Sequence, residues 1–368
     1  GAGFPAGLKW GFMPKEPEVL KYLCVNTDEG EPGTFKDREL VEKDPHQIIE
    51  GAIIAAYAVG AHRAFVYIRG EFFMGVKRWI KAIADAYERG YLGQNILGSG
   101  FSLDMTVHRG AGAYICGEET AMLNSLEGRR GEPRLKPPYP AQKGYLAQAT
   151  LVHNVETLAN VPHIVAHGAE WYAGIGTEKS TGPKVFCVSG HVYRRGVYEL
   201  PLGASLREII YAHAGGVPGG KKIKAVIPGG ASTPLLTADK LDTAMDFESL
   251  SAAGSALGTG AIVVMDEDTC MVDVARRTAR FFAHESCGRC APCRIGSRRI
   301  VEILENIEAG RGREGDIERL RDLCDGIAGR TFCPMGDALT APIRSSLNLF
   351  ADEYQAHLRG RGCIRAAA

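Results

Sequence analysis

The first half of the chain alternates between strand-like and helix-like patterns of apolar residues. Buried strands are predicted at 22–25 and 64–69, and a strand of alternating polarity at 101–107. Apolar positions with helical spacing cover 44–60 and 74–88. Strands that alternate with helices in this way are typical of an α/β sheet.

Capping residues support the boundaries of these helices. Asp44 is an N-cap residue, Pro45 suits the first turn, and Gly60 provides a C-terminal stop. Asn154 is the predicted N-cap of a further helix that runs to Gly168. We therefore predict a first α/β domain over residues 1–176.

The second half separates into two parts with different patterns. A compact α+β domain is predicted over 177–265, where short strands surround one amphipathic helix at 206–214. This domain has glycine-rich turns and no catalytic-looking group of residues, so a structural or interface role is its default interpretation. From 266 to 368 the pattern is helical, and four helices with short loops predict a bundle: 272–282, 295–307, 316–327 and 338–358.

Composition excludes several classes of function. Of 368 residues, 45% are hydrophobic and 23% charged, as in ordinary globular proteins. The formal net charge is zero, so no basic field attracts nucleic acid. The apolar runs are too short to span a bilayer, so any membrane attachment is expected through partners. The chain opens on Gly1 rather than methionine, and we expect that an N-terminal portion precedes it.

Ten cysteines without an export signal suggest a reducing compartment and thiols that bind metal. Cys287, Cys290 and Cys293 have a C-x2-C-x2-C spacing, and Cys333 precedes a proline. A triplet plus one distant thiolate is typical of a [4Fe–4S] cluster, whereas zinc sites usually show two separated pairs. Cys324 is interpreted as core. The remaining cysteines lack ligand spacing and are interpreted as having no metal: Cys24, Cys116, Cys187, Cys270 and Cys363.

A glycine-rich loop at residues 1–14 is a candidate phosphate site. Its glycines can expose N–H groups to a phosphate, Lys9 can neutralise the charge, and Phe4 and Phe12 can stack on a flat ring. Taken alone, such a loop is more often an ordinary turn.

Two acidic loops follow predicted strands. Asp28, Glu29 and Glu31 lie just beyond the first strand, where carboxylates can contact ribose hydroxyls or ring donors; a solvated turn is the alternative. Glu118 and Glu119 lie in the first turn of a helix that continues through Leu126. The helix dipole alone would favour acids there, but α/β sheets also place ligands at such junctions.

Several long motifs together resemble one family, the NADH-oxidising flavoprotein (51-kDa-type) subunit of respiratory complex I. The motifs occur in unbroken order over essentially the whole chain: GAGFPAGLKW, VNTDEGEPGTFKDRE, RGAGAYICGEETA, EPRLKPPYPA, NVET, ESCGRCAPC and TFCP. The resemblance implies an FMN-binding Rossmann-like α/β domain, a β-grasp (ubiquitin-like) domain and a C-terminal four-helix bundle that carries a [4Fe–4S] cluster.

The resemblance also implies roles for individual residues. FMN would contact the glycine loop, the two acidic loops and the start of the helix at Asn154: Gly1, Gly3, Lys9, Asn26, Asp28, Glu29, Tyr114, Gly117, Glu118, Asn154 and Thr157. NADH would bind aromatic and charged residues near the same place: Phe4, Phe12, Glu31, Glu119, Lys136 and Tyr139. The cluster ligands would be Cys287, Cys290, Cys293 and Cys333.

By resemblance, a hydride passes from NADH to FMN, and single electrons pass through the cluster and partner subunits to quinone. Stacking of the two rings would be the main catalytic task, with no protein acid or base required. The implied partners are a thioredoxin-like [2Fe–2S] subunit and a larger iron–sulfur subunit. The implied location is cytoplasmic, on the inner side of the bacterial membrane, or on the matrix side in mitochondria.

Three alternatives stay open at this point. Ile295 stands where many complex I members carry Glu, and the resulting Arg-Ile-Gly form resembles diaphorase subunits of NAD-linked formate dehydrogenases and hydrogenases. A non-catalytic iron–sulfur scaffold that has lost its flavin is a second alternative, although the intact acids and lysine argue against it. A zinc-stabilised interaction module is the third, and metal analysis would separate it.

Overall fold

The computed structural model describes residues 3–360 and residue 363. The chain divides into two compact units. Unit 1 comprises Gly1–Gly30 and Phe35–Ile175, and unit 2 comprises Glu31–Thr34 and Gly176–Ala368. The short segment Glu31–Thr34 thus leaves unit 1 and packs with unit 2.

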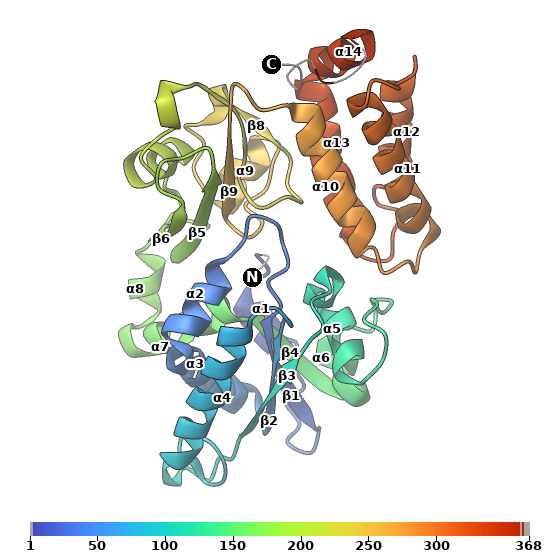
Figure 1. The fold of residues 1–368 in the computed structure, drawn as a ribbon. Helices are drawn as coiled ribbons and strands as arrows, with labels where there is room; N and C mark the ends of the chain where they lie inside the picture. The colour runs from blue at the N-terminus through green and yellow to red at the C-terminus, as the bar shows by residue number, and fades with distance from the viewer. Residues whose placement is uncertain (1–2, 361–362, 364–368) are drawn as a thin grey trace. The chain divides into compact units, whose positions relative to one another are not determined.

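Unit 1 is built on a four-stranded parallel sheet with the order β3-β2-β1-β4 (Figure 1). The strands are β1 Lys21–Thr27, β2 Arg63–Ile68, β3 Asp104–Arg109 and β4 Ala149–Asn154. The α/β prediction is confirmed, but the third strand begins three residues later than predicted, and β4 was missed. The β4 side chains Ala149, Leu151 and Val152 are buried together with Thr150 and His153, so this strand has no clean polar–apolar alternation.

Alternation along β1 and β2 separates the two faces of this sheet. Leu23, Val25 and Val66 belong to the main apolar core, which the helices α3 and α4 cover. On the opposite face Phe65 lies against Tyr145, with 4.7 Å between ring centroids. One face of the sheet is thus occupied by helices, and the other by the aromatic residues of a connecting segment.

The helices of unit 1 are α1 Ala6–Gly11, α2 Lys36–Lys43, α3 Pro45–Val59, α4 Phe73–Glu88, α5 Glu119–Leu126, α6 Pro140–Lys143, α7 Val155–His167 and α8 Ala169–Ala173. The capping predictions are confirmed. The Asp44 side chain accepts from the Gln47 N–H at 3.2 Å, and Gly60 is left-handed with φ 75°. The Asn154 side chain accepts from the Glu156 N–H at 2.9 Å.

Helix α2 was not predicted from the sequence. It is rich in charged residues, and no cap residue of the usual kind precedes it. Its first N–H groups are satisfied from further away, because the carboxylate of Glu29 accepts from Asp37 and Arg38 at 2.9 and 3.2 Å. Local sequence patterns do not reveal a cap of this kind.

Unit 2 begins with a five-stranded mixed sheet of order β6-β5-β9-β7-β8. Its strands are β5 Pro183–Gly190, β6 Gly196–Pro201, β7 Ile223–Ile227, β8 Leu236–Thr237 and β9 Ala261–Asp266. The first and last strands are parallel neighbours at the centre, which is the β-grasp arrangement expected. The predicted helix at 206–214 is wound as a π-helix over Glu208–His213, and the short helix α9, Phe247–Ala252, was missed.

The helical part of unit 2 contains α10 Met271–Glu285, α11 Ala291–Glu308, α12 Asp316–Ile327, α13 Met335–Leu349 and α14 Ala351–Gly360 (Figure 1). The first four helices pack in a closed ring as α10–α11–α12–α13, so the four-helix bundle is confirmed. The prediction of one last helix over 338–358 was wrong. Phe350, with φ −127°, interrupts it and packs against the apolar cluster that includes Met265 and Met271. Tertiary packing therefore overrides the helical pattern there.

Within the described part of the chain, no helix is both long and apolar enough to cross a membrane.

Candidate functional site

The carboxyl ends of β1 and β4 form the natural ligand position of unit 1. The chain adds β2 and β3 on one side of β1 and then returns to place β4 on the other side. In parallel sheets, ligands bind at such a reversal of strand order, beyond the carboxyl ends of the strands. Asn26 and Asn154 are register partners at these two ends, so the topology brings these two candidate FMN residues together.

Hydrogen bonds connect the end of β1 to the second glycine loop. The Asn26 side chain donates to the Gly117 carbonyl at 3.0 Å and accepts from the Asp28 N–H at 3.0 Å. A Cβ at Gly117 would lie 3.2 Å from the Asp28 carbonyl oxygen, so the two loops are in close contact. The tight turn Tyr114–Gly117 immediately precedes α5. These contacts fix the backbone on which several predicted FMN contacts lie.

A cavity of about 780 Å³ in unit 1 is lined by residues from the opening loop, α5, the proline-rich loop and β4. Its size is that of ordinary cofactor pockets. Six sequence-predicted residues line it: Phe4, Lys9, Phe12, Glu119, Lys136 and Tyr139. The other lining residues are Pro140, Ala141, Gln142, Thr150, Leu151 and Val152. The aromatic and aliphatic side chains offer surfaces for flat rings, and the two lysines can pair with phosphates.

Lys9, Glu119 and Lys136 line this cavity, and Glu118 pairs with Lys136 beside it. Lys136 Nζ lies 2.7 Å from Glu119 Oε1 and 2.9 Å from Glu118 Oε1. Lys9 Nζ lies 3.6 Å from the other Glu119 oxygen and donates to the Val152 carbonyl at 3.2 Å. Burial alone would lower the pKa of Lys136, but the two glutamates raise it on balance. The charges of these two lysines and two glutamates sum to zero, so they produce no strong net field at the cavity.

Glu118 caps α5 and also pairs with a lysine of the cavity, while its contact with FMN stays a prediction. One carboxylate oxygen accepts from the Thr120 and Ala121 N–H groups, each at 2.9 Å, which makes Glu118 the N-cap of α5. The other oxygen faces Lys136. The helix therefore holds this carboxylate in place while its second oxygen stays directed at the charged residues of the cavity.

Behind Asn154 lies a buried network of charged residues that the sequence did not reveal. Lys36, only 1% exposed, lies 2.6 Å from Asp37 and 2.9 Å from Glu156. The Asn154 amide donates to Asp37 at 2.6 Å. Burial alone would lower the pKa of Lys36, but the two carboxylates raise it on balance.

Glu29, which caps α2 from the same region, has a pKa raised to about 7 by burial and by Asp37. Both Glu29 oxygens already have N–H partners, so it supports the site from behind.

His153, at the end of β4, is buried as a neutral side chain. Its Nε2 accepts from the Trp10 indole N–H at 2.7 Å. Burial and the nearby Lys9 ammonium lower its pKa to about 3. This hydrogen bond attaches α1, which carries Lys9, to β4.

The remaining candidates lie in several places. Gly1 lies outside the described residues, whereas Gly3 is left-handed with φ 89°. Thr157 lies in the first turns of α7. Glu31 belongs to the segment that packs with unit 2, and its carboxylate accepts from the Ser232 N–H at 2.7 Å. An NADH contact by Glu31 stays a prediction.

The four predicted cluster ligands lie at one end of the helical part of unit 2. Cys290 is the N-cap of α11 and Cys293 lies in its first turn, while Cys333 lies between α12 and α13. The Arg289 guanidinium lies 4.4 Å from the Phe332 ring centroid, and this contact brings the Cys333 turn against the cysteine loop. Burial and the neighbouring thiols raise the pKa of Cys293. Three thiols around the start of α11, with a fourth on the turn before α13, fit an iron–sulfur cluster.

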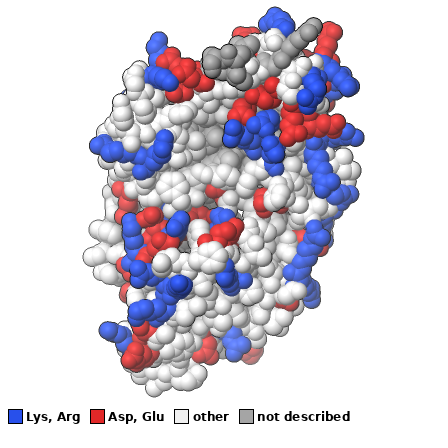
Figure 2. Space-filling view, in the orientation of Figure 1, with Lys and Arg blue, Asp and Glu red and all other residues white. Residues whose placement is uncertain are grey.

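Surface charge in unit 1 is balanced at short range. Over the helices α2 and α4, positive and negative side chains lie next to each other (Figure 2). The i,i+4 pairs Arg38–Glu42, Lys43–Glu39 and Lys81–Asp85 account for much of this pattern. This arrangement agrees with the zero net charge and leaves no broad basic surface on these helices.

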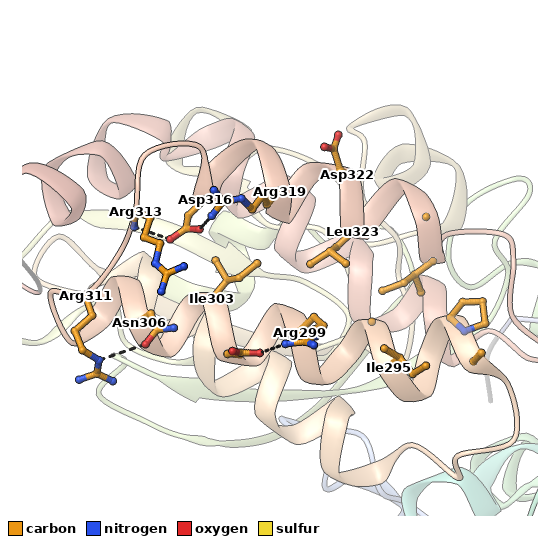
Figure 3. Close-up of a pocket in the computed structure, with 16 residues that line it drawn as sticks. Ile295, Arg299, Ile303, Asn306, Arg311, Arg313, Asp316, Arg319, Asp322 and Leu323 are labelled. Carbon is orange, nitrogen blue, oxygen red and sulfur yellow. Dashed lines mark hydrogen bonds and ion pairs between the residues drawn. The ribbon is translucent and has the colours of Figure 1, made fainter.

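A second cavity, of about 690 Å³, lies between α11 and α12 and carries several arginines (Figure 3). Arg299 pairs with Glu302 at 2.7 Å, and Arg319 pairs with Asp316. Arg311 donates to the Asn306 side chain. These local pairs reduce the positive charge, and of the predicted FMN and NADH contacts that the structure describes, none lines this cavity.

Three family models match successive parts of the chain. Residues 1–163 match the Nuo51 FMN-binding domain, residues 184–264 the SLBB domain, and residues 273–357 the NADH-ubiquinone oxidoreductase-F iron–sulfur binding region. The chain thus carries an FMN-binding domain and a [4Fe–4S] binding region.

Relatives that match nearly the whole chain come from two kinds of complex. An F-type subunit of NADH-quinone oxidoreductase in Rhizobium meliloti (strain 1021) is 57% identical over 363 residues, which cover 99% of this chain and 86% of the relative. The corresponding F-type subunit of Mycobacterium bovis is 52% identical over 99% of this chain and 82% of the relative. The HndC subunit of an NADP-reducing hydrogenase in Solidesulfovibrio fructosivorans is 49% identical over 99% of this chain and 74% of the relative.

Among solved structures, a chain of an NAD+-reducing [NiFe]-hydrogenase in the H2-reduced state superimposes with a TM-score of 0.89 and 38% identity. The match covers 97% of this chain and 60% of that chain. The same fold therefore occurs in a chain of a hydrogenase.

Proposed function

Because the chain belongs to the family of F-type subunits of NADH-quinone oxidoreductases, we propose that it oxidises NADH with FMN and delivers the electrons to quinone through partner subunits. One observation carries the proposal. Six residues predicted for FMN or NADH from distant parts of the sequence line a single cavity beside the carboxyl end of β4. These residues are far apart in the sequence, so it is the fold that brings them to one cavity.

The residues of the cavity bind and orient rather than exchange protons. Phe4, Phe12 and Tyr139 offer faces for the nicotinamide, adenine or flavin rings, and Lys9 can neutralise a phosphate. Lys136, held by Glu118 and Glu119, can donate to the dinucleotide from a fixed position. Because hydride transfer requires two rings in contact, holding them there is the main catalytic contribution of the protein.

When bound, FMN supplies the two-electron acceptor for hydride, and the [4Fe–4S] cluster supplies a one-electron acceptor. Cys287, Cys290, Cys293 and Cys333 would hold the cluster in unit 2. The chain would then exchange electrons with a thioredoxin-like [2Fe–2S] subunit and a larger iron–sulfur subunit. Its expected place is peripheral, on the inner side of the bacterial membrane, with attachment through these partners.

A second assembly is supported by specific observations. The hydrogenase chain that superimposes on this protein and the HndC relative share its fold or sequence over nearly its full length. Ile295 is exposed near the cluster loop and gives the Arg-Ile-Gly sequence that resembles diaphorase subunits. In that assembly the chain would exchange electrons with a hydrogenase or formate dehydrogenase instead of passing them to quinone.

An anaerobic absorbance spectrum of the full-length protein, recorded before and after addition of NADH, tests the proposal. We expect the flavin band near ~450 nm to bleach, with loss of the broad iron–sulfur absorbance. An iron–sulfur spectrum without flavin and without a response to NADH would overturn the proposal and favour the scaffold. One zinc in place of four irons would favour the interaction module.

We expect NADH to be used in preference to NADPH. An additional 2′-phosphate next to Glu118 or Glu119 would be repelled by these carboxylates, and Lys9 and Lys136 offset only part of that repulsion because both are already paired with them. Single-turnover flavin reduction should be at least about ten times faster with NADH, and Glu119→Gln should narrow the difference. Equal rates for the two dinucleotides in the wild-type protein would refute this expectation.

Replacing Lys136 by methionine should weaken NADH binding with little loss of FMN. The substitution removes one charge-assisted donor, and kcat/KM for NADH should fall about 10- to 100-fold. Steady-state kinetics together with flavin content would measure both effects. Lys143→Met, which changes a lysine of neighbouring helix α6 that does not line the cavity, is the matched control and should keep wild-type kinetics.

A further inference from the structure

Four side chains of types that can bind metal converge in unit 2, away from the predicted cluster cysteines. They are Cys270, Glu308, His357 and Cys363, and their ligand atoms all lie within 4.8 Å of one another. Cys270 is the N-cap of α10, Glu308 is the last residue of α11, His357 belongs to α14, and Cys363 follows that helix. The group thus joins the start of the helical part to its C-terminal end.

The distances within this group suit a single tetrahedral ion. Cys270 Sγ lies 3.3 Å from His357 Nε2 and 3.9 Å from Glu308 Oε2, and these last two atoms are 3.5 Å apart. Bonds of about 2.0–2.3 Å from zinc to nitrogen, oxygen and sulfur give a tetrahedron whose edges are about 3.3–3.8 Å. The side chains therefore need little movement to enclose an ion.

The surrounding contacts orient the ligands as metal sites require. His357 is 1% exposed, and its Nδ1 lies 2.8 Å from the Glu353 carbonyl oxygen, so Nδ1–H donates there and the Nε2 lone pair faces the group. The Asp273 N–H donates to Cys270 Sγ at 3.4 Å. The Cys363 N–H donates to the Glu308 carbonyl at 3.3 Å. Each of the two cysteines is thus held by a backbone contact.

Glu353 gives this arrangement a further layer of support. Its carboxylate accepts from the Met271 N–H at 2.9 Å and from Lys224 Nζ at 2.6 Å. Lys224 also donates to the Thr269 carbonyl, next to Cys270. The chain on both sides of the ligand Cys270 is therefore fixed, and a nearby ammonium partly balances the negative charge of the ligands.

We propose that Cys270, Glu308, His357 and Cys363 bind a structural zinc ion. Two thiolates, an imidazole and a carboxylate form a donor set that suits zinc rather than magnesium or calcium. Four protein ligands leave no open position, which is typical of structural and not of catalytic sites. The ion would hold the C-terminal segment against the first turn of α10. The inference is independent of the redox function, because it uses none of the cluster cysteines.

Metal analysis of the purified full-length protein tests the site directly. We expect about one zinc together with four irons per chain. Cys363→Ser, a change near the end of the chain, should lower zinc at least ~5-fold and leave iron unchanged. Cys324→Ala, which removes a buried thiol of α12 outside the group, should keep both metals. Four irons without zinc in the wild-type protein would overturn the proposal, as would full zinc in the Cys363→Ser variant.

X-ray absorption at the zinc edge of the same holoprotein identifies the ligands. We expect two sulfur neighbours at about 2.3 Å and two nitrogen or oxygen neighbours at about 2.0–2.1 Å. A shell of four sulfurs, with iron reduced in proportion, would show zinc in the cluster cysteines instead and would reject the site. This readout does not depend on NADH oxidation, so it separates a failure of the site from a failure of the proposed function.

Discussion

Replacing Cys333 by serine should disrupt the iron–sulfur cluster while the flavin reaction survives. Cys333 is the predicted ligand that is distant in sequence from the other three, and the Arg289–Phe332 contact brings its turn to the α10–α11 loop. Loss of one thiolate should lower iron from four to three or fewer per chain. Mutation of a residue that only hydrogen-bonds to a metal ligand typically lowers metal affinity or activity about 10- to 100-fold. Loss of a ligand itself should therefore reduce the rate of electron delivery to a one-electron acceptor on the order of 100-fold or more.

Iron content, the electron paramagnetic resonance signal after NADH addition, and single-turnover bleaching of the flavin would be measured on the same sample. The cavity residues lie in unit 1, so NADH should still bleach the flavin at the wild-type rate. Cys324→Ala is the control, because Cys324 is a fully buried thiol in the same bundle. An unchanged iron content in Cys333→Ser would remove Cys333 from the ligand set. Loss of iron in the control would show that the bundle, and not the ligand, had failed.

The elements that the sequence predicts well are those with local signals. Helix α3 has Asp44 at its start and Gly60 at its end, and both take the expected conformations. The three closely spaced cluster cysteines also have a local signal, their spacing, and their binding of the cluster stays a prediction. Where the physical cause lies within a few residues, the pattern along the chain was sufficient.

The elements that were missed depend on contacts between distant residues. Helix α2 is capped by Glu29 from across a loop, and the break at Phe350 arises from packing against the β-grasp core. The group around Cys270 and Cys363 joins residues that are far apart in the sequence, so neither cysteine showed ligand spacing. Predicting such features requires the fold first, because only the fold makes these residues neighbours.

The predicted cavity contacts lie between these two extremes. Phe4, Lys9 and Lys136 were assigned by resemblance to a family, and the structure shows that they line one cavity. Resemblance did not reveal that Lys136 bridges two glutamates, nor that Glu118 is also a helix cap. Geometry therefore changes the expected effect of a mutation: at Glu118 a substitution would disturb α5 as well as the cavity.

Replacing Lys36 by methionine should destabilise unit 1 by about 3–5 kcal/mol, because it leaves buried carboxylates without their cation. Asp37 and Glu156 are 3% and 6% exposed, and both rely on Lys36. Asp37 also accepts from Asn154 at the end of β4, so the loss should loosen this candidate FMN contact. Chemical denaturation, followed by circular dichroism, would give the change in the free energy of unfolding, and flavin content would report on the site.

Lys43→Met is the matched control, since Lys43 lies in the same helix with its side chain 76% exposed and only an i,i+4 partner. It should change stability by less than about 0.5 kcal/mol. The double variant Lys36→Met/Glu156→Gln should recover part of the loss, because one of the two buried carboxylates that faced Lys36 is then neutral. Equal stability of Lys36→Met and Lys43→Met would show that the buried charges are compensated in another way. Partial recovery, in contrast, would establish that the network supports the end of β4 through its charges and not only through packing.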